Sequence, residues 1–258
     1  MKVVVYNIAY GTGCPKGEAR RLITGHHYLA APERPLRKIG TFLQGEKPDI
    51  TGLLEADLGS PRTRGCNQAA ILAEMTGMTP VYFRKYAPDS KLLSLPYWRS
   101  QGNAVLVPDV DPDAAAGFMP HGMKKLVLSV RTCGVHFFLV HLALTYPVRR
   151  AQIAWLTEML EKVSEPVILA GDFNTFRGDG ELAELCRRRG LVSANTDGHG
   201  TYPAWKPVKV LDHILYSPEL ELVDFQVPHL PFSDHLPIVA DFRISCGTLP
   251  AMGGVKNF

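Results

Sequence analysis

The most informative stretch of this chain is residues 167–174, Val-Ile-Leu-Ala-Gly-Asp-Phe-Asn. Four apolar residues that run into a glycine and an acid predict a buried strand ending at Asp172. Asp172 and Asn174 are two positions apart, so on extended backbone their side chains lie on one face, which suits a metal ion or a phosphate group. For a single Asp or Asn at the end of a strand, a turn-forming role is the ordinary alternative.

The same pattern recurs along the chain as short runs rich in Val, Ile, Leu and Phe. It predicts nine strands, at residues 2–7, 50–55, 80–84, 103–107, 125–131, 135–142, 167–172, 212–216 and 238–244. Apolar residues at spacings of three and four predict helices at residues 35–44, 67–76, 148–162 and 180–189. The runs 125–131 and 135–142 flank a short Thr-Cys-Gly connection, which indicates a hairpin, so we expect two sheets that are not purely parallel.

The composition limits the classes of protein to consider. The chain has 258 residues, 46% of them hydrophobic, and we expect one domain at residues 1–246 followed by a loose tail at residues 247–258. A formal net charge of +3 is a weak argument for a polyanionic partner. No apolar run is long enough for a transmembrane segment and the start does not resemble a signal peptide, so we expect a cytoplasmic location. Five cysteines without a short Cys-x-x-Cys spacing predict free thiols.

Polar side chains end or flank six of the strand-like runs. They are Asn7, Glu55, His141, Asp172 with Asn174, Asp212, and Asp234 with His235. Residues at the ends of different strands can meet at one edge of a sheet, which is a common way to build an active site. His141 alone is equally well a core histidine, but the joint occurrence favours a site. The oxygen-rich set suits Mg²⁺ or Mn²⁺ better than zinc, and such ions serve phosphate chemistry.

Taken in order, these motifs resemble those of the endonuclease/exonuclease/phosphatase superfamily of metal-dependent phosphohydrolases. Gly-Asp-Phe-Asn at residues 171–174 and Ser-Asp-His-Leu-Pro at residues 233–237 are similar to its most specific strings. Leu-Glu-Ala-Asp at residues 54–57 is similar to its Gln-Glu-Val-Asp strand end, and residues 101–106 resemble its Gly-Asn-Ala strand. The resemblance, to small bacterial members in particular, implies an α/β fold: a four-layered α/β sandwich of two mixed β-sheets face to face, with helices outside.

The resemblance also implies roles for the polar residues. Glu55, helped by Asn7 and supported by Asp234, is expected to hold Mg²⁺ (or Mn²⁺). Asp212 would orient His235 into a proton-handling dyad, and Asp172 would align or deprotonate the attacking water. His141 and Asn174 would donate hydrogen bonds to the phosphoryl oxygens. Ala9 departs from the apurinic-endonuclease branch, which tends to keep an acid at this position.

The motifs do not choose among phosphate-ester substrates, so the loops must decide. The candidate substrate-binding residues are Arg62, Arg64, Asn103 and Trp205. Basic and aromatic loops favour a small or lipid-like phosphate ester cleaved by a phosphodiesterase or phosphatase, although solvated charge and simple loop packing explain such residues equally well. A nuclease acting on DNA or RNA is the alternative, but no long Lys/Arg arm is present to grip duplex DNA, and a non-catalytic binding module is the third possibility. The sequence does not indicate an oligomeric state.

Overall fold

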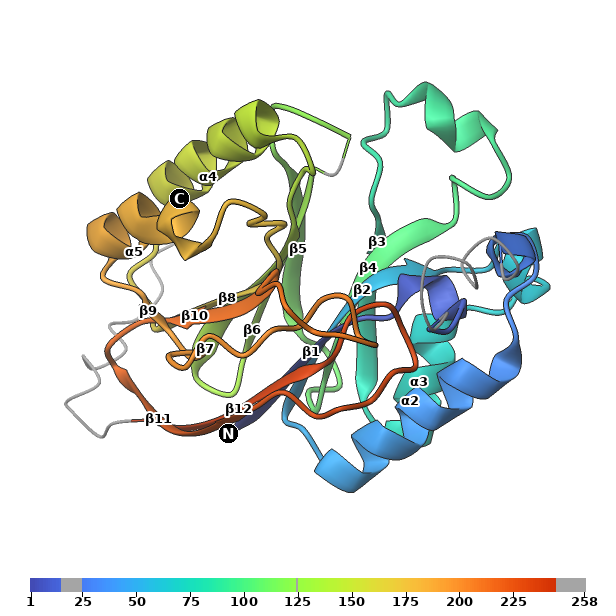
Figure 1. Cartoon of the computed structure of the whole chain (residues 1–258), viewed down its shortest axis with the longest axis horizontal. Coiled ribbons are helices and arrows are strands. Elements are labelled where there is room, and N and C mark those ends of the chain that lie inside the picture. The colour runs from blue at the N-terminus through green and yellow to red at the C-terminus, as the bar shows by residue number, and fades with distance from the viewer. Residues whose placement is uncertain (15–24, 124, 245–258) are drawn as a thin grey trace.

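Two mixed sheets of six strands each pack face to face in the computed structural model, which describes residues 1–14, 25–123 and 125–244 (Figure 1). The first sheet contains, in spatial order, β11 (Leu220–Gln226), β12 (Ile238–Ile244), β1 (Lys2–Asn7), β2 (Ile50–Asp57), β4 (Gln101–Val107) and β3 (Thr79–Arg84). The second sheet contains β5 (Asp113–Phe118), β6 (Leu126–Thr132), β7 (Val135–His141), β8 (Val167–Asp172), β10 (Asp212–Tyr216) and β9 (Val192–Ser193). The expectation of two mixed sheets is confirmed.

Helices cover the outer face of each sheet, which gives four layers (Figure 1). Helices α2 (Glu33–Glu46) and α3 (Gln68–Thr76) lie on the first sheet, where Ile39 and Leu72 pack with Leu53. Helices α4 (Tyr146–Leu160) and α5 (Ala183–Arg189) lie on the second sheet. A third apolar cluster, including Phe137 and Ile168, fills the space between the sheets. Burial on both faces explains why the central strands are almost continuously apolar.

The direction of the strands brings the polar strand ends to one edge of the sandwich. Each sheet has one central parallel pair, β1 with β2 and β7 with β8, so Asn7 and Glu55 leave the first sheet where His141 and Asp172 leave the second. Strand β10 runs antiparallel to β8 and places Asp212 directly opposite Asp172. Strand β12 runs antiparallel to β1, so the segment that precedes it arrives at the end of β1. Ligand sites of open α/β sheets lie at such carboxyl ends.

Three strands were not predicted, and each has a weak sequence signal. The β5 strand is an edge strand of Ala, Gly and Asp, which have low β-propensity, and β9 has only two residues. The β11 strand does alternate, but its register shifts between Leu222 and Asp224 and leaves Val223 exposed. A bulge of this kind breaks the period of two that identifies a strand.

Some expectations fall at the limits of the described chain. The predicted tail at residues 247–258 lies outside the described residues. Within the described ranges, Cys14, Cys66, Cys133 and Cys186 form no disulfide bond, as expected. A search of the described residues found no helix with both the length and the apolar character needed to cross a membrane.

Candidate active site

The Asp172 carboxylate is the centre of the polar cluster at the strand ends. Its Oδ2 lies 3.2 Å from Asn7 Nδ2, 3.1 Å from His141 Nε2 and 3.7 Å from His235 Nε2, so it contacts residues from both sheets. Its Oδ1 accepts a hydrogen bond of 3.0 Å from the backbone N–H of Asn174. The side chain is almost completely buried, so these contacts hold the carboxylate in one orientation.

Backbone geometry next to Asp172 depends on glycine. Gly171 has φ +142°, and a Cβ there would lie 1.9 Å from the carbonyl oxygen of Val140 on the neighbouring strand. Only a residue without a side chain fits this close approach. The glycine therefore allows β8 to turn Asp172 toward the residues of β7 and β1.

His235 and Asp212 form a buried hydrogen-bonded pair. His235 Nδ1 lies 2.8 Å from Asp212 Oδ2, and the hydroxyl of Thr201 donates to the same oxygen at 2.6 Å. Burial by itself lowers the pKa of His235, but the carboxylates of Asp212 and Asp172, with Asp234, outweigh it and raise that pKa to about 10. The ring is therefore protonated at neutral pH, with Nε2 directed toward Asp172.

Glu55 owes its position to an irregularity in β2. The pairing of β2 with β4 shifts register between Leu53 and Ala56, and Glu55 has the left-handed φ of +52°. Asn103 on β4 holds this bulge, because its Oδ1 accepts a hydrogen bond of 3.3 Å from the Glu55 backbone N–H. A left-handed non-glycine residue is strained and is found preferentially at functional sites. The bulge leaves the Glu55 carboxylate half-buried at the edge of the cluster.

His141 lies between the two acids. Its Nε2 is 3.1 Å from Asp172 Oδ2 and its Nδ1 is 3.9 Å from Glu55 Oε1, so it bridges the two sheets. Asn174 also has a left-handed backbone, with φ +52°, and its side-chain amide donates to the carbonyl oxygen of Leu142 at 2.9 Å. One of its two N–H groups is therefore already committed to the protein.

Asp234 is half-buried beside His235 and raises the pKa of that ring through its charge. Its backbone carbonyl accepts a hydrogen bond of 2.8 Å from Ala204, which attaches the loop around Trp205 to the site. Tyr202 of the same loop lies with its ring centroid 4.9 Å from that of His235, and Phe176 lies edge-on to Tyr202 at 6.4 Å.

Two of these neighbours were missed by sequence reasoning. Thr201 donates a hydrogen bond to Asp212, but the two residues are 11 positions apart and no sequence pattern links them. Phe176 lies just after the Asp-Phe-Asn motif and looks like an ordinary loop residue. Both are recognisable only from their contacts with Asp212 and Tyr202.

The two arginines expected to bind substrate lie elsewhere. Arg62 is buried, donates from Nε to the carbonyl oxygen of Tyr28 at 2.8 Å, and places Nη1 3.4 Å from Asp57 Oδ2. Its guanidinium also stacks 4.5 Å from the ring centroid of Tyr10. Arg64 is exposed two residues further along the chain. The structure therefore brings together the expected catalytic and metal residues but does not place Arg62 in contact with them.

The residues of the cluster fit a divalent cation. Ligand atoms of Asp172, Asp212 and His235 lie within 4.8 Å of one another, and Asp212 Oδ1 is buried with no hydrogen-bond partner among the described residues. A buried carboxylate oxygen without a donor is costly unless something compensates its charge. Because His235 Nδ1 is already bonded to Asp212, however, this pair is better arranged as a dyad than as the main ligands. The half-buried carboxylates of Glu55, near His141, and of Asp234, beside His235, offer further oxygens, and Asn7 contacts Asp172 through its side-chain N–H.

Sequence comparison shows a relative in Escherichia coli (strain K12), the uncharacterized protein YbhP. It is 33% identical over 121 residues, which cover 43% of this chain and 47% of YbhP. The match thus spans about half the length of this relative.

Solved structures with little sequence identity share the fold. A functionally unknown conserved protein from Enterococcus faecalis V583 has a TM-score of 0.67 at 14% identity, covering 95% of this chain and 100% of that chain. The mannosyl-6-phosphatase Bt3783 of Bacteroides thetaiotaomicron VPI-5482 has a TM-score of 0.66 at 15% identity, with coverage of 94% and 99%. The human Nocturnin catalytic domain has a TM-score of 0.64 at 19% identity, with coverage of 95% and 93%.

A family model provides the wider match. The model of the Endonuclease/Exonuclease/phosphatase family aligns with residues 4–235, which include the strand ends from Asn7 to His235. The fold, the convergence of those strand ends and a match over almost the whole chain agree with one another. The protein therefore belongs to the Endonuclease/Exonuclease/phosphatase family.

Proposed function

We propose that the protein is a divalent-metal-dependent hydrolase of phosphate esters. The observation that carries this proposal is the position of Asp172, whose Oδ2 lies within 3.7 Å of His235, 3.1 Å of His141 and 3.2 Å of Asn7. A carboxylate held between two imidazoles and an amide is arranged to orient a water molecule and to manage its proton. Family membership supports the same class of reaction.

The protein's own residues have distinct parts in the proposed reaction. Asp172 orients the attacking water and accepts its proton. His235 is protonated at neutral pH, so its Nε2 donates a hydrogen bond or a proton to an oxygen of the phosphate, while Asp212 fixes the ring through Nδ1. His141 donates to a phosphoryl oxygen as negative charge develops.

Glu55, with Asn7 and Asp234, would hold Mg²⁺ or Mn²⁺. When bound, such an ion neutralises the phosphoryl oxygens and lowers the pKa of the attacking water. Glu55 is half-buried, so its carboxylate is not completely enclosed by protein. The bulge held by Asn103 keeps that carboxylate aimed at the cluster.

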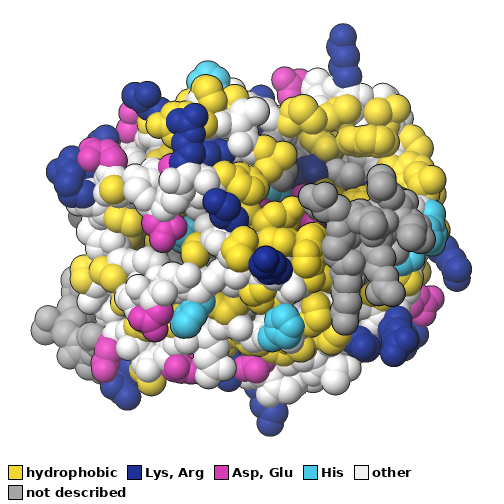
Figure 2. Space-filling model, viewed as in Figure 1, with side chains coloured by type: hydrophobic (Ala, Val, Ile, Leu, Met, Phe, Trp, Pro, Cys, Tyr) yellow, Lys and Arg dark blue, Asp and Glu magenta, His cyan; other side chains and the backbone are white. Residues whose placement is uncertain are grey.

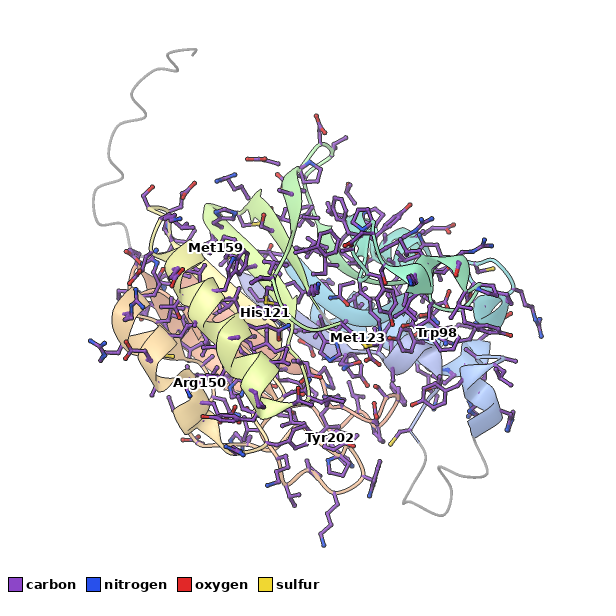
Figure 3. The ribbon with its side chains drawn as sticks, turned by 90° about the horizontal axis from the view of Figure 1, so that it is seen from above. Trp98, His121, Met123, Arg150, Met159 and Tyr202 are labelled. Carbon is purple, nitrogen blue, oxygen red and sulfur yellow. The ribbon has the colours of Figure 1, made fainter. Side chains whose placement is uncertain are left out.

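The substrate we favour is a small or lipid-like phosphate ester. The net charge of +3 provides no strong field for a long polyanion. Figure 2 shows hydrophobic side chains gathered over the centre and upper right of one face. Trp98 and Met123, labelled in Figure 3, are 40% and 63% exposed, and Tyr202 packs against the ring of His235. The likeness to a mannosyl-6-phosphatase supports a phosphate monoester among the substrates to be tested.

A substrate panel tests the proposal. The purified protein would be assayed with a chromogenic phosphodiester, sugar phosphates, phospholipids, inositol phosphates, plasmid, single-stranded DNA and RNA, each with Mg²⁺, Mn²⁺ or EDTA. We expect metal-dependent turnover of the small or lipid-like esters, and its loss in His235→Ala. If the protein cleaves plasmid or oligonucleotides orders of magnitude faster than every small phosphate ester, this proposal is wrong and the protein is a nuclease.

A further inference from the structure

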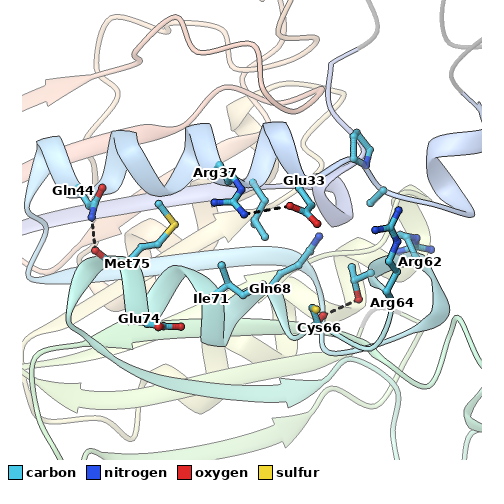
Figure 4. Close-up of a pocket in the computed structure, with 14 residues that line it drawn as sticks. Glu33, Arg37, Gln44, Arg62, Arg64, Cys66, Gln68, Ile71, Glu74 and Met75 are labelled. Carbon is cyan, nitrogen blue, oxygen red and sulfur yellow. Dashed lines mark hydrogen bonds and ion pairs between the residues drawn. The ribbon is translucent and has the colours of Figure 1, made fainter.

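A cavity of about 830 Å³ lies between helices α2 and α3 and the loop that follows β2 (Figure 4). This volume is within the range of roughly 300–1,000 Å³ that is typical of small-molecule sites. Its lining includes Arg62, Arg64 and Cys66 from the loop and Leu36, Ile71 and Met75 from the helices. None of the catalytic or metal residues described above lines it, so it is separate from the candidate active site.

One end of the cavity is rich in hydrogen-bond donors. Arg62 is only 4% exposed, and it donates from Nε to Tyr28 and from Nη1 to Asp57, whereas its Nη2 has no acceptor among the described residues. Arg64 and the first turn of α2 lie at the same end, and the α2 N-cap Pro32 provides no side-chain cap (Figure 4). A buried guanidinium with unused donors beside the positive end of a 14-residue helix favours a bound anion.

Apolar side chains of both helices form part of the remaining wall, together with polar ones such as Gln44 and Glu74. Leu36 is buried on α2, and Ile71 and Met75 are half-buried on the facing side of α3. The acid of the first turn, Glu33, is paired with Arg37 at 3.3 Å. Figure 4 shows Arg62 and Arg64 at one end of the cavity and Met75, with Gln44 and Glu74, toward the other, so the two arginines lie at the end away from Met75.

We propose that this cavity binds an anionic amphiphile, a molecule with one carboxylate or phosphate head at Arg62 and Arg64 and an aliphatic body against Leu36, Ile71 and Met75. An anion without the aliphatic part would leave the α2–α3 walls uncovered, and a cationic head would face two arginines. This inference does not rest on the proposed hydrolase activity, since no proposed catalytic residue lines the cavity.

Binding here has a direct structural route to the catalytic strands. Arg62 contacts Asp57, the last residue of β2, two positions after Glu55. The same guanidinium stacks on Tyr10, three positions after Asn7. Arg62 therefore connects the cavity wall to both segments that carry the first sheet's site residues.

Cys66 provides a native reporter for the test, because it is a free, exposed thiol in the cavity wall. The rate of its alkylation by iodoacetamide would be followed by peptide mass spectrometry in EDTA, with Cys133 and Cys186 as internal references. The probes are decanoate, decyl phosphate, decyltrimethylammonium and inorganic phosphate, all below micelle-forming concentrations. At ten times its Kd, a ligand that covers Cys66 slows alkylation about tenfold.

We expect protection of Cys66 by decanoate, by decyl phosphate or by both, and the stronger of the two identifies the head group. Absence of protection by either, or equal protection by decyltrimethylammonium or inorganic phosphate, would overturn the proposal. Arg64→Gln and Ile71→Gln should each reduce the protection at least several-fold, whereas Arg34→Gln, at an exposed position of α2 outside the cavity, should leave it unchanged. Retention of full protection in both cavity variants would also reject the site.

The active-site variant His235→Ala separates this inference from the proposed function. Its protection by decanoate should equal that of the unmodified protein, because the cavity does not include the dyad. If protection disappears in His235→Ala and persists in Arg64→Gln, the amphiphile binds at the strand ends and the cavity proposal fails. Loss of all hydrolase activity, by contrast, would leave the result of the alkylation experiment unaffected.

Discussion

At the scale of single residues, the charge of His235 results from two opposing effects. Burial disfavours the imidazolium, whereas three carboxylates favour it, and the carboxylates prevail because the pKa rises to about 10. Asp212 contributes both its charge and a 2.8 Å hydrogen bond. The ring is thus held in one orientation and in one protonation state at neutral pH.

Because His235 and Asp212 act as one unit, we expect the effects of their substitutions on kcat to be non-additive. His235→Ala should lower kcat by on the order of 10²–10⁴-fold, the range for losing a positioned acid or base. Asp212→Asn should act in the same direction because it releases the ring, and the double variant should cost little more than the worse single variant. Steady-state kinetics with thermal midpoints would measure this, with the exposed His199→Ala as a control. Multiplicative losses would show that the two residues act separately.

Glu55 predicts a change in metal requirement. Glu55→Gln removes one negative oxygen from the proposed ligands, so the Mg²⁺ concentration at half-maximal activity should rise by on the order of 10-fold or more. A metal titration of activity measures this, and the exposed Glu158→Gln should show the normal titration. Full activity of Glu55→Gln in EDTA would contradict the assignment.

His136 predicts a pH dependence of stability. It is buried against Phe138, with no hydrogen-bond partner for either ring nitrogen among the described residues. Burial, with a further contribution from Arg131, lowers its pKa below the unfolded value of 6.5. The unfolded chain therefore binds the proton more readily, and this residue destabilises the fold as the pH falls through about 6.5.

The His136→Leu variant has no imidazole at this position, so it should lack the loss of stability that protonation of His136 causes at low pH. Urea unfolding at pH 7 and pH 5 would measure it, and the free energy of unfolding of the variant relative to the parent should be higher at pH 5 than at pH 7. An equal difference at the two pH values would mean that folding does not lower the pKa of His136.

At the scale of elements, β8 shows how one backbone position controls the site. Gly171→Ala places a Cβ 1.9 Å from the Val140 carbonyl oxygen at φ +142°, so it should destabilise the fold by more than about 2 kcal/mol and disturb Asp172. Gly117→Ala on β5 meets no atom within 4 Å and should change stability by less than about 0.5 kcal/mol. Chemical denaturation of both variants is the measurement. Equal stability of the two would show that β8 can relax.

Elements with strong periodicity were predicted well, and irregular ones were not. Strands β1, β8, β10 and β12 have the predicted bounds. The bulge at Glu55 and the one beside Val223 could not be predicted, because a bulge depends on the partner strand that opposes it. Helix α5 begins three residues later than predicted, after a short 3₁₀ turn at Asp179–Leu182.

At the scale of the whole molecule, the modest net charge predicts a weak response to salt. Turnover of a small phosphodiester should change less than about twofold between 50 and 200 mM salt, because few counterions are displaced. A protein that grips DNA through 6–10 phosphates loses roughly 10³–10⁵-fold in affinity over the same range. Initial rates on a chromogenic diester and on plasmid would be compared. A steep loss for the small ester would show that local charge, rather than net charge, controls binding.

The sequence by itself determined the alternation of apolar runs with polar ends, and hence the two-sheet architecture and the candidate residues from Asn7 to His235. These signals are local, since they depend on periodicity and on short strings such as residues 171–174.

Only the tertiary structure decided which side chains meet. Parallel pairing of β1 with β2 and of β7 with β8 brings Asn7 and His141 to the same carboxylate of Asp172, although they are far apart in the chain. The same packing turns Arg62 away from that carboxylate and into the α2–α3 cavity. A guanidinium pairs with the carboxylates and aromatic rings that lie near it in the folded protein. The order of residues in the chain does not show which groups those are.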